Sequence, residues 1–143
     1  MTAENTALAT RATTSRRDLA GRGLLLLASL ATVGAGIRGM VYMSRVSDDR
    51  IWIESWRMTA FMLVAGLFAL LAWTPRAQRG VWELLFAQKA VLVVIAVVLG
   101  DVPEAREAGF VDFGLVAILV ASYLLCRGWQ SRRTTATENP VVA

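Results

Sequence analysis

The sequence predicts an all-α membrane protein with four transmembrane helices in an up-down antiparallel bundle. Hydrophobic residues make up 56% of the 143 positions, and the mean hydropathy is +0.52. A soluble domain is only about 45–50% apolar. The apolar residues fall in four blocks, each close to the ~20 residues that cross a bilayer as a helix. A soluble helix bundle would instead carry polar residues at every third or fourth position of each block.

The four apolar blocks set the expected helices and the limits of the membrane domain. Within a domain of residues 19–130, we expect transmembrane helices at about 23–43, 57–74, 82–100 and 110–127. The flanking segments are small and polar without an apolar period, which is typical of disorder. We therefore expect a disordered cytoplasmic arm over residues 1–18 and a disordered cytoplasmic tail over residues 131–143.

The connections between the blocks are short. Pro75 and Gly80 indicate a tight turn between the second and third helices, and residues 101–109 form a similar turn between the third and fourth. The longest connection, residues 44–56, has room for a short interfacial segment. Since short connections make successive helices antiparallel neighbours, they predict the up-down topology.

The arginines predict the orientation. If both termini are cytoplasmic, that side carries Arg11, Arg16, Arg17, Arg22, Arg76, Arg79, Arg127, Arg132 and Arg133. The other side carries only Arg45, Arg50, Arg57 and Arg106, with Arg38 inside the first helix. Cytoplasmic loops are enriched in arginine and lysine. We therefore expect a multi-pass protein with both termini in the cytoplasm.

The composition also bears on the compartment and on the partner. Many arginines with many Ala, Val and Gly are typical of a GC-rich bacterial genome, which would make the compartment the bacterial inner (plasma) membrane. A sequence pI near 10.2 would suit a nucleic-acid-binding protein. However, the arginines flank apolar blocks and do not cluster on a soluble face. We therefore expect the lipid bilayer as the partner and no nucleic acid.

The pair Arg16–Arg17 before an apolar run has a second interpretation, as a twin-arginine export signal with a removable first helix. Two observations disfavour it. The apolar run continues to Met43 with Arg38 inside it, and no small-x-small cleavage site precedes water-facing sequence. We favour arginines that anchor the first helix on the cytoplasmic side, and the export signal remains the alternative.

Small residues in the first helix predict close helix packing. Ala28, Thr32 and Gly36 follow one another at four-residue spacing and so lie on one face. Small residues at this spacing let the backbones of two membrane helices approach closely. The partner of this face is either another helix of the chain or a second copy.

Lys89 is the only lysine and lies inside an apolar block. It follows Leu84 by five residues, which places it roughly 8 Å from the cytoplasmic boundary. Its side chain leans toward the N-terminus of its helix, and hence toward cytoplasmic water. We expect Lys89 to extend to the surface, with Gln88 and Glu83 lining its exit. The alternative is a buried cation with a functional role.

Arg38 lies in the first helix with the opposite lean, away from the nearer water. Because a guanidinium stays charged, an ion-pair partner is expected. Asp112, in the first turn of the fourth helix, matches its depth best. The pair would be either a structural clamp between the first and fourth helices or, with Arg57, an outward-facing polar vestibule that binds a ligand.

The sequence offers little chemistry. It contains no histidine and one cysteine, Cys126, which is more often a small hydrophobic residue than a reactive thiol. A metal site built from this chain is therefore disfavoured. No nucleophile–base pair or phosphate-binding glycine loop is present. We expect no cofactor, no metal and no enzymatic activity.

An arginine-bearing first helix is followed by "WRMTAFMLVAGLFALLAWTPR" (56–76), which contains Gly66 and a Pro-Arg turn at 75–76. In this pattern and in size, about half of the chain resembles small bacterial four-helix membrane proteins of the DoxX-like kind. That resemblance implies an accessory membrane protein, and some such families are linked to redox complexes. Small multidrug-resistance transporters also have four helices, but they carry a glutamate in the first helix where this chain has Arg38.

From these observations we expect a non-enzymatic accessory or assembly subunit, within a homo-oligomer or a larger membrane complex. The alternative is a small transporter or channel that handles an anion or a lipid headgroup through Arg38, Arg57 and Lys89.

Overall fold

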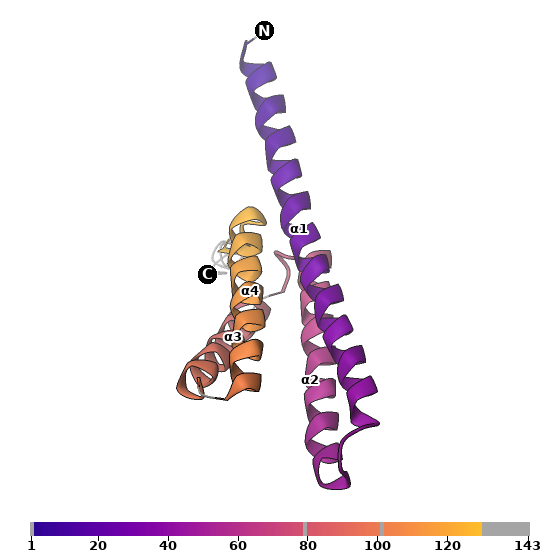
Figure 1. The fold of residues 1–143 in the computed structure, drawn as a ribbon. Coiled ribbons are helices and arrows are strands. Elements are labelled where there is room, and N and C mark those ends of the chain that lie inside the picture. The colour runs from indigo at the N-terminus through magenta and orange to yellow at the C-terminus, as the bar shows by residue number, and fades with distance from the viewer. Residues whose placement is uncertain (1, 79, 101, 130–143) are drawn as a thin grey trace, which may run out of the picture.

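A computed structural model describes residues 2–78, 80–100 and 102–129 as four helices with short connections (Figure 1). The helices are α1 (Thr2–Met43), α2 (Asp48–Trp73), α3 (Val81–Val98) and α4 (Pro103–Leu125). No strand occurs in these ranges. The prediction of an all-α chain with four helices is confirmed.

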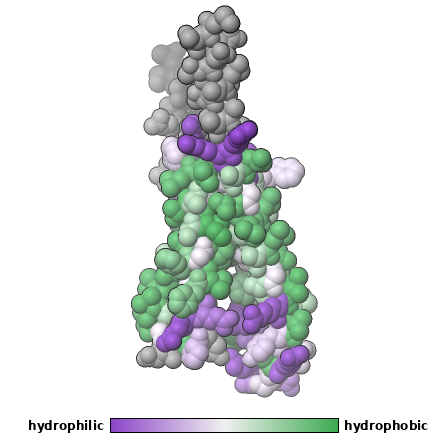
Figure 2. Space-filling view, turned by 45° about the horizontal axis from the view of Figure 1, so that its top comes forward, coloured by the Kyte–Doolittle hydropathy of each residue, from purple (hydrophilic) through white to green (hydrophobic). Residues whose placement is uncertain are grey.

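The surface of the four helices is largely apolar. Large hydrophobic side chains point outward along the chain, for example Leu30 on α1, Val97 on α3 and Phe110 on α4. Figure 2 shows this apolar surface between two levels of hydrophilic residues. Each helix is long and apolar enough to cross a membrane. These features fit a small multi-pass membrane protein.

Two helices begin earlier than the sequence predicted. α2 starts at Asp48 and not at 57, and α4 starts at Pro103 and not at 110. Ser47 precedes α2 in an extended conformation, and the acidic residues Asp48 and Asp49 occupy its first turn, where the helix dipole favours negative charge. Pro103 occupies the first turn of α4, where its missing N–H costs nothing.

The N-terminal segment differs from the expectation of disorder. The structure continues α1 through residues 2–18, which the sequence predicted to be a disordered arm. This segment has several alanines, the best helix formers, and contains no proline or glycine, the strongest helix breakers. The predicted tail over residues 131–143 lies outside the described residues.

The helices form two antiparallel hairpins, α1–α2 and α3–α4 (Figure 1). α1 packs extensively on α2, and the hairpins meet mainly where α1 contacts α4, whereas α2 contacts α3 little. We call the end that carries Arg16, Arg17, Arg22, Arg76 and Arg127 the arginine end, and the end with connections 44–47 and 99–102 the loop end. The hairpins lie close together toward the arginine end and diverge toward the loop end (Figure 1).

The hydrophobic core fills the half of the bundle nearer the arginine end. All four helices contribute buried side chains to it: Leu25, Ala28, Val64, Phe68, Leu71, Ala72, Trp82, Leu85, Leu115 and Leu119. Trp82 also donates a hydrogen bond from its indole N–H to the carbonyl oxygen of Pro75, at 2.8 Å. This bond satisfies the one polar group of a side chain that is only 2% exposed.

α1 and α4 approach each other closely at Gly21. A Cβ atom on this glycine would lie 2.6 Å from Sγ of Cys126 and 3.0 Å from Cβ of Leu125. Glycine is therefore the residue that allows the two hairpins to pack together at the arginine end.

Candidate functional site

The most buried charged contact joins α3 to α4. Nζ of Lys89 lies 2.6 Å from Oδ1 of Asp112 and donates a hydrogen bond to it. The Lys89 side chain is 3% exposed and that of Asp112 is 14% exposed. Because both groups are removed from solvent, each depends on the other for electrostatic compensation.

The pair lies near the middle of the α3–α4 hairpin. Lys89 precedes the end of α3 at Val98 by nine residues, and Asp112 follows the start of α4 at Pro103 by nine. Both therefore lie about 13.5 Å from the loop end of their helices. Since the helices are antiparallel, equal separation from the connection places the two side chains opposite each other.

Two predictions are corrected by this pair. Lys89 does not extend to the surface, and Asp112 pairs with Lys89 and not with Arg38. The physical reason is the early start of α4, which places Asp112 in the third helical turn and not the first. The Asp112 carboxylate is therefore nearer to the Lys89 ammonium than the water at the membrane surface would be.

The two residues expected to line a lysine exit have other environments. Oε1 of Gln88 is buried without a hydrogen-bond partner among the described residues. Glu83 lies exposed in the first turn of α3, near the arginine end. In the described part of the chain, the hydrogen-bond and ion-pair partner of the Lys89 ammonium is Asp112.

Arg57 and Arg38 do not form the predicted vestibule with Asp112. Nη2 of Arg57 lies 2.6 Å from Oε2 of Glu54, one turn away on α2, although not in hydrogen-bonding geometry. The Glu54 side chain is 3% exposed, whereas Arg57 is half exposed. Arg38 is exposed and forms no ion pair with any described residue.

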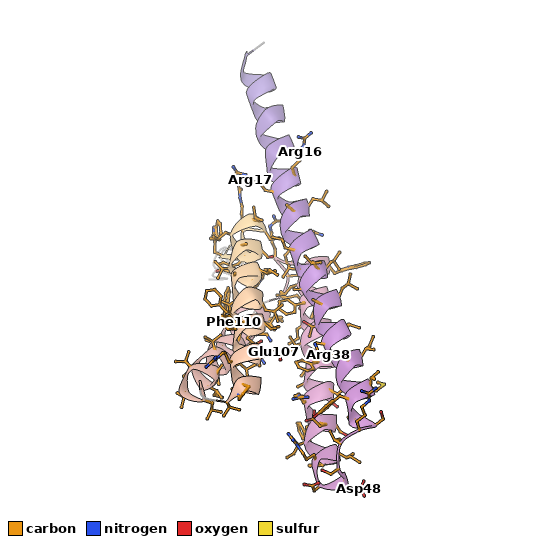
Figure 3. All side chains as sticks on the ribbon, in the orientation of Figure 1. Arg16, Arg17, Arg38, Asp48, Glu107 and Phe110 are labelled. Carbon is orange, nitrogen blue, oxygen red and sulfur yellow. The ribbon has the colours of Figure 1, made fainter. Side chains whose placement is uncertain are left out.

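Arg38 lies on the part of the surface where the hairpins diverge. It precedes the loop end of α1 by five residues, or about 7.5 Å. Figure 3 places it on α1 at a height similar to that of Glu107 on α4, which belongs to the other hairpin. Figure 2 shows hydrophilic residues on both sides of the opening between the hairpins.

The small-residue face of α1 packs within the chain. Ala28 and Thr32 are buried, and Ser29 donates a hydrogen bond to the carbonyl oxygen of Ala65 on α2 at 2.9 Å. A Cβ atom on Gly36 would clash with the end of the Met62 side chain, also on α2. The sequence left open which helix this face meets, and in the structure it is α2.

A second charged cluster, which the sequence analysis did not single out, lies at the arginine end. Asp18 accepts a hydrogen bond from Arg22 at 3.1 Å and another from Arg76 at 2.6 Å. Arg22 also donates to the carbonyl oxygen of Trp73 at 3.2 Å. The cluster connects α1 to the end of α2 and to the turn that follows it. The available signal was that Asp18 is the one acidic residue among four nearby arginines, including Arg16 and Arg17.

Cys126 is buried beside this cluster. Its thiol donates a weak hydrogen bond to the carbonyl oxygen of Asp18 at 3.7 Å. Burial, and then the negative charge of Asp18, raises the pKa of the thiol, and Arg22 and Arg76 do not offset this. A protonated buried thiol is a poor nucleophile, so the environment suits a packing role.

The Lys89–Asp112 pair joins the two helices of the α3–α4 hairpin. No group of three metal-ligating side chains gathers within the described ranges. No family model, curated protein or solved structure matches the chain. The resemblance to DoxX-like proteins therefore stays a prediction.

Proposed function

We propose that the protein is a non-enzymatic accessory or assembly subunit of a membrane complex. The observation that carries the proposal is the exposed guanidinium of Arg38 within the apolar part of α1, without an ion-pair partner among the described residues. A charge inside the bilayer is costly unless it is paired or hydrated. A transmembrane helix of another protein that carries a carboxylate at this depth would remove that cost.

The position of the hydrophobic core supports this proposal over transport. Phe68, Leu85 and Leu119 are buried between the charges near the loop end and those at the arginine end. A transporter needs polar groups that continue from one side of the membrane to the other. In the described residues, the apolar core separates the two polar levels.

The alternative function is a small transporter or channel for an anion or a lipid headgroup. Its support is the presence of three cations, Arg38, Arg57 and Lys89, within the helices of the bundle. However, Glu54 and Asp112 neutralise Arg57 and Lys89. Of these three cations, Arg38 alone has no ion-pair partner among the described residues, which favours one contact with a partner over a multi-cation site.

The proposal includes an orientation. The arginine end would face the cytoplasm, because nine arginines of the sequence belong to that side: Arg11, Arg16, Arg17, Arg22, Arg76, Arg79, Arg127, Arg132 and Arg133. The other side has only Arg45, Arg50, Arg57 and Arg106, with Arg38 inside α1. The compartment would be the inner membrane of a bacterium, with both termini on its cytoplasmic side. Arg38 would then contact its partner toward the outer side of the membrane.

Native electrophoresis of membranes extracted in mild detergent tests the assembly proposal. The wild-type chain should migrate in a complex larger than its own monomer, and Arg38→Leu should release it. Arg50→Leu is the matched control, because Arg50 is also exposed but lies in the first turn of α2 at the loop end. A monomeric wild-type chain that drives anion flux into liposomes would contradict the proposal and support the transporter.

A further inference from the structure

An open pocket lies at the arginine end, away from the Lys89–Asp112 pair. It is lined by Arg17 of α1 and by residues at and just after the end of α4: Leu124, Leu125, Arg127 and Trp129. Its volume is about 370 Å³. Small-molecule pockets typically have volumes of roughly 300–1,000 Å³.

The pocket holds positive charge that no described residue neutralises. Of the arginines at this end, Arg22 and Arg76 both pair with Asp18. Arg17 and Arg127 form no ion pair within the described part of the chain. The charge of the pocket is therefore available to an anion from outside the protein.

The backbone conformation directly after α4 places two lining residues of the pocket, Arg127 and Trp129. Arg127 has φ 53°, and it is the only described residue other than glycine with a positive φ. This left-handed conformation is unfavourable for a side chain such as arginine. It turns the chain directly after α4, so that Arg127 and Trp129 line the same pocket.

The rest of the pocket lining is largely apolar and partly exposed. Leu124 is 58% exposed and Trp129 is 40% exposed. Tryptophan concentrates at the boundary between headgroups and hydrocarbon. A free anion would not contact the apolar lining residues. An amphiphile would place its charged group on Arg17 and Arg127 and its acyl chains along Leu124.

We propose that this pocket binds the phosphate headgroup of an anionic phospholipid. Arg17 and Arg127 contact the phosphate, and Leu124 and Trp129 contact the adjoining acyl chains. Basic pockets between transmembrane helices bind such headgroups through charge-assisted hydrogen bonds. The C-terminal dipole of α4 opposes an anion here, so the affinity must come from the two guanidinium groups. The inference requires membrane insertion but is independent of the proposed assembly role.

Arg16 provides a matched control for the charge. Figure 3 shows Arg17 extending from α1 toward the end of α4, whereas the neighbouring Arg16 points away from it. Both side chains are exposed. Removing either guanidinium therefore changes the net charge equally, and only one change affects the pocket.

Native mass spectrometry of the full chain in mild detergent tests the proposal, with phosphatidylglycerol titrated against phosphatidylcholine. The wild type should retain phosphatidylglycerol preferentially. Arg17→Gln and Arg127→Gln should each weaken retention about fivefold, as expected for loss of one membrane-facing cation. Arg127→Gly repeats the second test with a residue that adopts positive φ freely. Arg16→Gln should retain the wild-type preference.

Four results would overturn the proposal. Equal weakening by Arg16→Gln would show general charge attraction without a site. Unchanged retention in both Arg17→Gln and Arg127→Gly would remove the assigned contacts. If inorganic phosphate displaces phosphatidylglycerol, or Leu124→Ser leaves retention unchanged, the ligand is a free anion and not a lipid.

Discussion

Lys89 of α3 and Asp112 of α4 form a buried ion pair at 2.6 Å. Lys89 lies nine residues before the end of α3, and Asp112 lies nine residues after the start of α4. A shift of either helix by one residue would rotate one side chain of the pair away from the other by about 100°. The pair therefore selects one register for this hairpin. In any other register, each of these buried charges would lose its partner, which is strongly unfavourable.

The first prediction concerns this pair. Lys89→Met and Asp112→Leu should each destabilise the protein, by about 3–5 kcal/mol for a fully buried pair and less where water reaches Asp112. The double variant should recover much of that loss, since it leaves no unpaired charge. Thermal and denaturant unfolding in one detergent would measure all four proteins.

The interaction energy from this double-mutant cycle decides between pairing and coincidence. Strictly additive losses would show that the two side chains do not interact. A Lys89→Met variant that is as stable as the wild type would show that the lysine reaches water after all.

The second prediction separates stability from assembly at Arg38. Because Arg38 is exposed and has no described ion-pair partner, Arg38→Leu should leave the stability of the isolated chain within about 0.5 kcal/mol. The same unfolding measurement in detergent checks this. A loss of stability comparable to that of Asp112→Leu would mean that Arg38 stabilises the fold of the chain itself, and would contradict its assignment to a contact with another protein.

The third prediction compares two glycines on α1. Gly21→Ala should destabilise the protein, because the new Cβ would lie 2.6 Å from Sγ of Cys126 and 3.0 Å from Cβ of Leu125. Gly23→Ala is the control, since nothing lies within 4 Å of its Cβ position. Alanine there should stabilise the helix by up to about 1 kcal/mol. Opposite signs in thermal unfolding are expected, and equal effects would place the α1–α4 contact elsewhere.

The fourth prediction concerns the Cys126 thiol. Burial and Asp18 raise its pKa, so the thiolate fraction at neutral pH is smaller than in the unfolded chain. Maleimide labelling of the folded protein should be slow at pH 7 and should accelerate only at higher pH than in the denatured chain. Asp18→Asn should shift this profile to lower pH, since it removes a negative charge and releases Arg22 and Arg76. Labelling at pH 7 as fast in the folded as in the denatured chain would contradict the burial.

The sequence predicted the helices better than their contacts. Apolar blocks of nearly membrane-spanning length are a strong signal, so the all-α class and the four helices followed directly. The helix starts were less certain, because Asp48, Asp49 and Pro103 are polar or helix-breaking residues that also suit loops. They become helix starts because acidic residues and proline are tolerated in the first turn.

The missed ion pair follows from one such boundary. With the fourth helix expected to begin at 110, Asp112 was placed in its first turn, level with Arg38. Only the observed helix ends, Val98 and Pro103, give Lys89 and Asp112 equal distances from the connection and place them opposite each other. Glu54 was assigned to a loop for the same reason, although it is 4% exposed on α2. Close packing of the face that contains Gly36 was predicted from the spacing of small residues, but that its partner is α2 required the structure.

The account depends most on four helices that cross the membrane with the arginine end in the cytoplasm. Topology reporters fused after residues 15, 47, 78, 102 and 143 test this directly, because none of these positions lies within a candidate membrane span: residue 15 precedes the first span, which begins at Arg16, and residues 47, 78 and 102 lie between helices. The account predicts cytoplasmic, external, cytoplasmic, external and cytoplasmic signals, in that order, from a chain with an intact N-terminus. An external signal after residue 143, or a chain shortened by removal of α1, would contradict it.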